Sequence, residues 1–254
     1  MTVLLEGGCR VTGFKDGEPI ANGTLNVWPQ IGRANGASAI SLRTIEFAQG
    51  LSPGLRNQEC DEILYVLQGS ATILINGCSY TVESETGVYL PPGATLTVDN
   101  VNQAPLVLIS SQCPEPLTEA ETLPLLTAPS SQQSQSTSQP PIVRLADREA
   151  VPTADRWYRV LINDEVGSKQ ATQFVGSIPP GRAPDHFHNY EEVLFILCGV
   201  GRMWAGKTNT PIAAGSCIYL PTGQVHCVEN TGDGELRLLG VIYPAGSPSV
   251  RYDV

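Results

Sequence analysis

One segment of this chain occurs twice, and this internal repeat restricts the fold more than any other feature. Residues 62–100 align without a gap on residues 192–230 at a constant offset of 130. The identical positions include a glutamate that opens an apolar run, the glycine seven residues later, and a Pro-x-Gly turn followed seven residues later by asparagine. In a chain of 254 residues, such a repeat predicts two related domains rather than one large domain.

Short apolar runs separated by turn residues indicate an all-β fold. The chain has 25 glycines and 20 prolines, many of them in turn signals such as SPG, PPG and NG. The step Asn76-Gly77 joins two alternating runs and is a strong hairpin signal. Helical periodicity is scarce, and residues 116–128 are the best candidate for a short helix.

The stretch SSQQSQSTSQPP, residues 130–141, separates the two repeats. It is polar, low in complexity and without apolar content, which is typical of a flexible linker or an exposed loop. We therefore expect an N-terminal domain at residues 1–113, a linker at 114–141 and a C-terminal domain at 142–254.

All three histidines of the chain fall in the second repeat or just before it. His186 and His188 are two residues apart, so an extended chain presents both imidazoles on one face. His226 follows the turn Pro221-Thr222-Gly223, which closes another apolar strand. A lone histidine is usually a packing or surface residue, but three in this pattern, with none elsewhere, favour a shared metal site.

Glu192 is the predicted fourth ligand of this site. It opens the apolar run VLFIL, which has the length and composition of a buried strand. A carboxylate there must be paired, protonated or bound to metal, because its desolvation is costly. Three imidazoles and one carboxylate suit one divalent first-row metal, with Fe or Mn favoured and Ni, Co, Cu or Zn tolerated, and they leave two positions open for chemistry.

These residues resemble the two motifs of the cupin superfamily. Gly181, His186, His188, Glu192 and Gly199 match the first motif, with the opening glycine one residue closer to the histidine than usual. The second motif is matched in full by Gly215, Pro221, Gly223, His226 and Asn230. The resemblance implies two tandem double-stranded β-helix barrels of the cupin, or jelly-roll, type, that is, a bicupin.

The N-terminal repeat keeps the turn residues and lacks the ligands. The offset of 130 places Arg56, Gln58 and Leu96 opposite the three histidines, and none of these is a good metal ligand. Two explanations for the remaining Glu62 stay open. Either Arg56 pairs with it in a metal-free barrel, or Arg56 binds an organic anion at an accessory site.

Several chemistries are compatible with such a centre, since cupins host many of them on one scaffold. Dioxygenase-type chemistry on a small organic molecule is our first hypothesis; non-redox isomerase, decarboxylase, lyase or hydrolase chemistry is the second. A barrel that binds a metal or small ligand without turnover is a third. Candidate acid or base groups near the open positions are Tyr190, Glu191 and Tyr219, with Asp185, Arg182 and Gln224 as further polar neighbours.

Charge and composition limit the partners. The net charge of −10, with no basic run, makes nucleic acid a poor partner, and a small molecule is expected instead. No segment resembles a membrane span or a signal peptide, so we expect a cytoplasmic protein with no membrane partner. Seven scattered cysteines favour reduced thiols, with Cys227 packed away from the metal. The resemblance also makes a homo-oligomer plausible.

Overall fold

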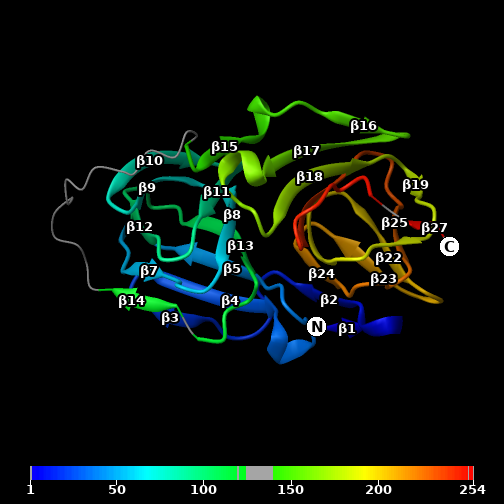
Figure 1. Ribbon diagram of the computed structural model, residues 1–254, viewed down its shortest axis with the longest axis horizontal. Helices are drawn as coiled ribbons and strands as arrows, with labels where there is room; N and C mark the ends of the chain where they lie inside the picture. The colour runs from blue at the N-terminus through cyan, green and yellow to red at the C-terminus, as the bar shows by residue number, and fades with distance from the viewer. Residues whose placement is uncertain (1, 119, 124–139, 251, 254) are drawn as a thin grey trace.

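The computed structural model describes residues 2–118, 120–123, 140–250 and 252–253, and they form two β-barrels side by side (Figure 1). The strands of the first half are β1 (Val3–Leu4), β2 (Arg10–Gly13), β3 (Ile20–Asn22), β4 (Leu25–Ile31), β5 (Leu42–Phe47), β6 (Gly50–Leu51), β7 (Gly54–Arg56), β8 (Asp61–Gln68), β9 (Ser70–Ile75), β10 (Cys78–Glu83), β11 (Thr86–Leu90), β12 (Thr95–Asn100), β13 (Leu106–Cys113) and β14 (Glu121–Leu123).

The second half follows the same order. Its strands are β15 (Ile142–Arg144), β16 (Val151–Thr153), β17 (Arg156–Ile162), β18 (Thr172–Ile178), β19 (Gly181–Arg182), β20 (His186–Phe187), β21 (Glu191–Cys198), β22 (Val200–Ala205), β23 (Thr208–Ala213), β24 (Ser216–Leu220), β25 (His226–Asn230), β26 (Leu236–Tyr243) and β27 (Tyr252–Asp253). The helical pieces are four 3-10 turns: η1 (Glu6–Gly8), η2 (Arg33–Asn35), η3 (Leu145–Asp147) and η4 (Asp164–Val166). The predicted all-β fold of two tandem barrels is confirmed.

Each barrel consists of two antiparallel sheets. The first barrel has the sheets β15-β11-β8-β13-β5-β4-β3 and β10-β9-β12-β7-β14, and the second has β1-β2-β24-β21-β26-β18-β17-β16 and β23-β22-β25-β20-β27. The repeat extends beyond the aligned segment, because β13 and β26 also lie 130 residues apart. Figure 1 shows each pair of sheets closing around its own interior.

The central strands contain continuous apolar runs because both of their faces are buried. In β21, Leu194 and Ile196 pack into the interior of the second barrel, whereas Val193 and Phe195 join a cluster that lies between the barrels. Strand alternation accounts for this division, since successive side chains point to opposite faces. In β8, Leu64 likewise packs into the interior of the first barrel, whereas its neighbours Ile63 and Tyr65 join the cluster between the barrels. The continuous apolar runs of the sequence therefore fill two cores at once.

Each half of the chain contributes at least one strand to a sheet of the other barrel. Strand β2, from the start of the chain, pairs with β24 of the second barrel, so that Val11 lies opposite Ile218. Strand β15, from the start of the second half, pairs with β11 of the first barrel, with Ile142 opposite Val88. The hydrogen-bonded sheets therefore cross the domain boundaries expected at residues 113 and 142, which remain a prediction.

Two local predictions have different outcomes. Asn76 and Gly77 form the two-residue turn between β9 and β10, both with positive φ (50° and 82°), as the hairpin signal predicts. The short helix expected at residues 116–128 is wrong at Glu121–Leu123, which form β14 against β7. Pairing with an exposed strand edge outweighs the weak local helical preference there. Most of the low-complexity stretch 130–141 lies outside the described residues.

Two further expectations concern the chain as a whole. All seven cysteines are unpaired thiols, as predicted. None of the helical segments in the described part of the chain combines the length and hydropathy needed to cross a membrane.

Candidate metal centre

The three histidines meet at one end of the second barrel. His186 lies on β20 and pairs across the sheet with His226, the first residue of β25, while His188 follows β20 directly. One nitrogen of each ring lies within 4.8 Å of those of the other two, and the ring centroids are 4.5–5.1 Å apart. Extended backbone at both motifs brings the imidazoles to one face, as the spacing predicts.

Backbone carbonyls orient all three rings. Each Nδ1 donates a hydrogen bond to a carbonyl oxygen, and the acceptors, for His186, His188 and His226 in turn, are Pro184 (2.9 Å), Val250 (2.9 Å) and Gln224 (2.8 Å). Because a carbonyl only accepts, Nδ1 carries the proton and Nε2 holds the lone pair that can coordinate a metal. Such contacts fix the tautomer and direction of metal-binding histidines.

Burial keeps two of the imidazoles neutral. Desolvation, followed by the charge of His186, lowers the pKa of His188 to about 4 and that of His226 to about 3. Both rings are therefore neutral at neutral pH, with a proton on Nδ1 only. A neutral ring is the form that binds metal, so these histidines need no deprotonation before they coordinate.

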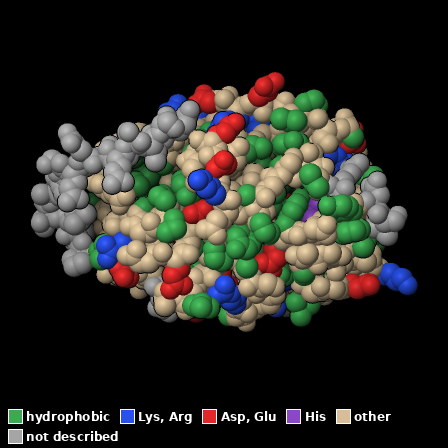
Figure 2. All heavy atoms as spheres, viewed as in Figure 1, with side chains coloured by type: hydrophobic (Ala, Val, Ile, Leu, Met, Phe, Trp, Pro, Cys, Tyr) green, Lys and Arg blue, Asp and Glu red, His purple; other side chains and the backbone are tan. Residues whose placement is uncertain are grey.

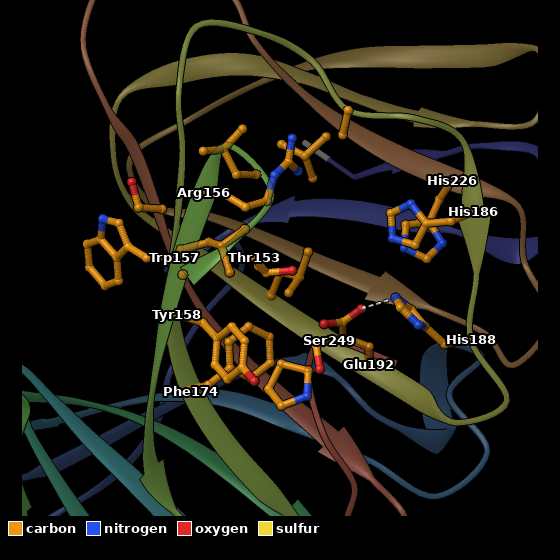
Figure 3. Close-up of a pocket in the computed structure, with 18 residues that line it drawn as sticks. Thr153, Arg156, Trp157, Tyr158, Phe174, His186, His188, Glu192, His226 and Ser249 are labelled. Carbon is orange, nitrogen blue, oxygen red and sulfur yellow. Dashed lines mark ion pairs between the residues drawn. The ribbon is translucent and has the colours of Figure 1, made fainter. Parts of the chain in front are cut away.

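Glu192 faces the histidines from the floor of the barrel (Figure 3). Its Oε2 lies 3.7 Å from Nε2 of His188, and its exposed fraction is 6%. Burial raises the pKa of this carboxyl to about 8 through desolvation, so a nearby positive charge would favour its ionised form. A divalent ion would supply the missing positive charge. The donor set of three imidazole nitrogens and one carboxylate thus fits one divalent metal.

A cavity of about 130 Å³ opens onto this centre. Its wall opposite the histidines comes from β16, β17 and β18, with Arg156, Tyr158 and Phe174 among the lining residues. The rings of Tyr158 and Phe174 meet edge to face, with centroids 6.5 Å apart. Figure 2 shows histidine at the molecular surface among hydrophobic side chains, so solvent reaches the centre. The space suits a small molecule with an anionic group and an apolar part.

The three predicted catalytic groups do not gather at this cavity. The ring of Tyr190 stacks on His188, with centroids 4.6 Å apart. Glu191 and Tyr219 hydrogen-bond to each other on the faces of β21 and β24 that point toward the first barrel. Strand alternation explains the difference, since Glu191 must face away from the side to which Glu192 points. Tyr190 thus supports a proposed ligand, and the other two residues lie outside the reach of a substrate.

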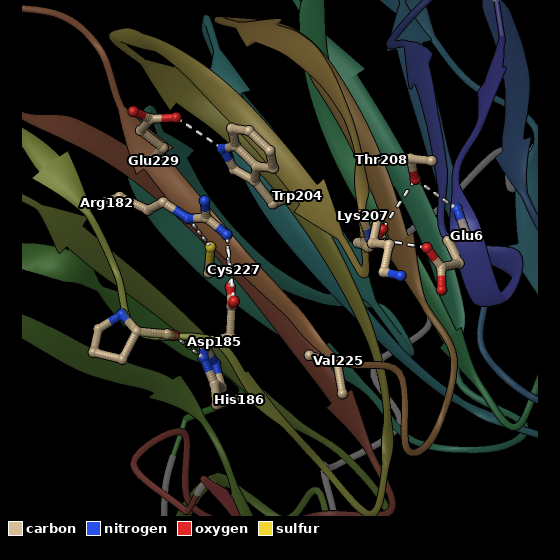
Figure 4. A network of polar contacts seen from close by, with 12 residues as sticks. Glu6, Arg182, Asp185, His186, Trp204, Lys207, Thr208, Val225, Cys227 and Glu229 are labelled. Carbon is tan, nitrogen blue, oxygen red and sulfur yellow. Dashed lines mark hydrogen bonds and ion pairs between the residues drawn. The ribbon is translucent and has the colours of Figure 1, made fainter. Parts of the chain in front are cut away.

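Two of the remaining polar neighbours, Arg182 and Asp185, belong to a network beside the centre (Figure 4), whereas the Gln224 amide donates to the carbonyl of Val225. Arg182 stacks over Trp204, pairs with Asp185 at 3.0 Å and donates from Nε to Sγ of Cys227 at 3.3 Å. Cys227 is fully buried, and desolvation raises the pKa of its thiol to about 11. The prediction of a packed, unreactive Cys227 is consistent with these contacts.

In the N-terminal barrel, the buried Glu62 is paired with a residue that neither of the two explanations for it involved. Glu62 pairs with Arg43 at 2.6 Å and accepts a hydrogen bond from Ser110 at 2.7 Å. Arg56 instead pairs with Glu121 of β14. The pair between Arg56 and Glu62, the first of the two explanations, is therefore wrong, because Arg43 reaches Glu62 from β5 across the intervening strand β13. The cavity beside Glu62 measures only about 10 Å³, and Arg56 does not line it.

Comparison with known proteins places the second barrel in a family. A family profile described as "Cupin domain" matches residues 174–242, which include the metal-centre residues. The oxalate-binding protein of Thermotoga maritima is 34% identical over 85 residues, covering 32% of this chain and 70% of that protein. The chain belongs to the cupin family. Another cupin relative, auxin-binding protein 1 of Arabidopsis thaliana, is 33% identical over 86 residues, which cover 30% of this chain and less than half, 43%, of that protein.

Solved structures extend the likeness in fold to nearly the whole cupin chain. Oxalate decarboxylase from Bacillus subtilis at pH 4.6 superposes with a TM-score of 0.75 at 16% identity, covering 93% of this chain and 77% of that one. A second oxalate decarboxylase structure, which concerns substrate binding and reaction specificity, gives 0.76 over 96% of this chain and 79% of that one, also at 16% identity. At this identity the comparison establishes the shared double-barrel fold alone.

One cavity residue lies beyond the reach of the sequence motifs. Arg156 stands 30 residues before His186, at the start of β17, and the corresponding strand of the first barrel begins with Leu25. The available signal was the difference between β4 and β17, two otherwise equivalent strands. Only β17 begins with a cation, which pairs with Asp155 at 3.0 Å.

Proposed function

We propose that this protein is a metal-dependent cupin enzyme that acts on a small organic acid in its C-terminal barrel, by oxygenase-type chemistry. His186, His188, His226 and Glu192 hold one divalent ion, Fe or Mn. The convergence of three imidazoles, each with Nδ1 hydrogen-bonded to a carbonyl, supports this proposal most strongly. A structural metal does not require a cavity of about 130 Å³ that opens onto it.

The residues around the centre divide the remaining tasks. A bound Fe or Mn ion supplies Lewis acidity toward a chelating carboxylate and electron transfer to dioxygen. Arg156, whose Nε donates to Asp155 at 3.0 Å, would hold the acid group with its remaining donors, while Tyr158 and Phe174 exclude water from the apolar part of the cavity. Among the described lining residues, Glu192 is the single carboxylate, and as a ligand it is not available as a general base. Oxygenase chemistry at the metal needs fewer acid and base groups from the protein than the non-redox chemistries do.

Metal analysis tests the centre itself. Wild-type protein produced in metal-replete medium should contain about one metal ion per chain, and His188→Ala should contain almost none, since loss of one ligand opens the set. Gln224→Ala, which keeps the backbone carbonyl that orients His226, should retain the metal. Near-zero metal in the wild type would disprove the proposed function.

Oxygen uptake separates the two leading chemistries. We expect the metal-loaded protein to consume dioxygen with small keto, hydroxy or dicarboxylic acids. Release of carbon dioxide without oxygen uptake would instead favour decarboxylation, the second candidate, which the names of the oxalate-binding and oxalate decarboxylase relatives support. Binding of acids without turnover would identify a binding protein.

Arg156 offers a separate test of the substrate class. Carboxylic acids should raise the unfolding midpoint of the metal-loaded wild type, because they bind only the folded state. Arg156→Gln should lose most of that shift, since the cavity then lacks its cation. Arg159→Gln, on the same strand but outside the cavity lining, should keep the shift. Equal shifts in both variants would contradict a role for Arg156 in substrate binding.

A further inference from the structure

A buried acid at the start of β21 ties the second barrel to the first. Glu191 is 5% exposed, and its carboxylate accepts hydrogen bonds from the backbone N–H groups of Ser38 and Ala39, both at 2.7 Å. The hydroxyl of Tyr219 donates to the same carboxylate. Because Ser38 and Ala39 lie in a loop of the first barrel, we call these four residues the Glu191 latch.

The first barrel carries the same arrangement in the opposite direction. Asp61, the repeat counterpart of Glu191, is 3% exposed and accepts a hydrogen bond from Tyr89 at 3.0 Å. The Ser168 side chain and the Gln170 backbone, both in a loop of the second barrel, lie close enough to Asp61 to stabilise its charged form. These residues form the Asp61 latch. Each barrel thus holds a loop of the other through one buried acid and one tyrosine.

The two latches differ in what stands next to them. Glu191 is followed by Glu192, whose carboxyl lies 3.7 Å from His188. Asp61 is followed by Glu62, which is fixed by Arg43 and has no histidine nearby. Only the Glu191 latch therefore adjoins the metal centre.

The position of Glu191 gives this contact leverage on Glu192. It is the first residue of β21, and the residues just before it, 188–190, lie outside any strand. In a strand, fixing one side chain on one face also fixes the direction of its neighbour on the other face. Three charge-assisted hydrogen bonds to Glu191 thus restrain the backbone from which Glu192 projects.

We infer that the Ser38–Ala39 loop of the N-terminal barrel positions Glu192 through Glu191, so that the barrel without histidines contributes to metal affinity in the other barrel. This inference rests on the proposed metal site. Glu191 is a positioning residue, which acts on the centre through the strand it begins.

The repeat supplies a matched pair of variants. Glu191→Ala and Asp61→Ala each remove one acid from equivalent latches, so a merely structural role predicts similar losses for both. Co²⁺ titration followed by visible absorption measures affinity and ligand geometry together. We expect Glu191→Ala to bind Co²⁺ about tenfold more weakly than wild type, with an altered absorption band, and Asp61→Ala to bind within about twofold of wild type.

Tyr219→Phe and Tyr89→Phe provide a milder pair if an alanine variant fails to fold. Each removes a single hydroxyl, and only Tyr219→Phe should weaken Co²⁺ binding, by about threefold. Equal losses within both pairs, or unchanged binding in every folded variant, would overturn the inference while leaving the metal site intact. A wild-type protein that binds no Co²⁺ would overturn the proposed function, and this inference with it.

Discussion

Two adjacent glutamates at the start of β21 have unrelated environments. Glu191 is held by donors from the other barrel, whereas Glu192 faces three imidazoles in its own barrel. Their difference comes from a single step along a strand, which reverses the face on which a side chain lies. Strand alternation therefore determines the environments of these two side chains more than their proximity in sequence does.

The raised pKa of Glu192 predicts how metal affinity depends on pH. Burial raises this pKa to about 8, so below pH 8 a metal must displace a proton from the carboxyl. His188 and His226 are already neutral above about pH 5, because their pKa values are lowered to about 4 and about 3. Ionisation of Glu192 should therefore raise the association constant about tenfold per pH unit from pH 6 to 8, and this contribution should then level off. Competition with a chelator of known affinity measures it.

Glu192→Gln is the control for this pH dependence. The amide does not ionise, so the variant should bind metal more weakly, and its affinity should rise about tenfold less per pH unit than that of the wild type between pH 6 and 8. A wild-type affinity that stays constant over this range would contradict the assignment, as would equal slopes in the two proteins.

The convergence of the three histidines was predictable because its geometry is local. An H-x-H spacing and a glutamate at the head of an apolar run suffice to bring three of the groups to one face. Glu191 and Tyr219 became catalytic candidates because both lie near the proposed ligands in sequence, but they do not line the cavity. The partners of Glu191 in the other barrel, Ser38 and Ala39, are about 150 residues away, and no local sequence pattern predicts such a contact.

At the scale of elements, strand β2 contributes apolar side chains to the second barrel, most of whose residues lie far later in the chain. Val11, 6% exposed, packs with Ile218 and its neighbours in the interior of the second barrel. Val11→Ala should lower the free energy of unfolding by about 2 kcal/mol, as measured by urea denaturation, because it leaves a cavity.

Leu4→Ala is the matched comparison for this substitution. Leu4 lies on the neighbouring strand β1 with 65% of its surface exposed, so the change should stay within about 0.5 kcal/mol. Comparable losses in the two variants would show that the contribution of β2 does not come from the interior of the second barrel.

The presence of two related barrels followed from the repeat, but the exchange of β2 and β15 did not. A strand of three or four residues specifies only that it is extended, and several edges could accept it. The same ambiguity explains β14, where a pattern with helical appearance completes a sheet.

For the molecule as a whole, the shared core predicts cooperative unfolding. The largest sheets of the two barrels bury one apolar cluster between them, with Tyr65 and Ile109 from one side and Phe195 and Leu239 from the other. Neither barrel can unfold without exposing this surface. We expect a single calorimetric transition, although each half has the size of an ordinary domain.

The shift of this calorimetric transition on metal binding is the complementary measurement. An ion present at about 100 times its dissociation constant adds about 2.7 kcal/mol to a cooperative unit. The entire transition should therefore move to higher temperature. Two transitions, of which only one responds to metal, would show that the barrels unfold independently.

The strand exchange also bears on the ancestry of the chain. After a duplication, a copy that has no histidines would ordinarily be free to decay or be deleted. Here each copy completes a sheet of the other, through β2 and β15, so natural selection on the metal-bearing half also acts on its partner. A gene that lost the first copy would lose β2 and with it part of the second barrel's wall, so the half without histidines cannot be deleted without cost to the other.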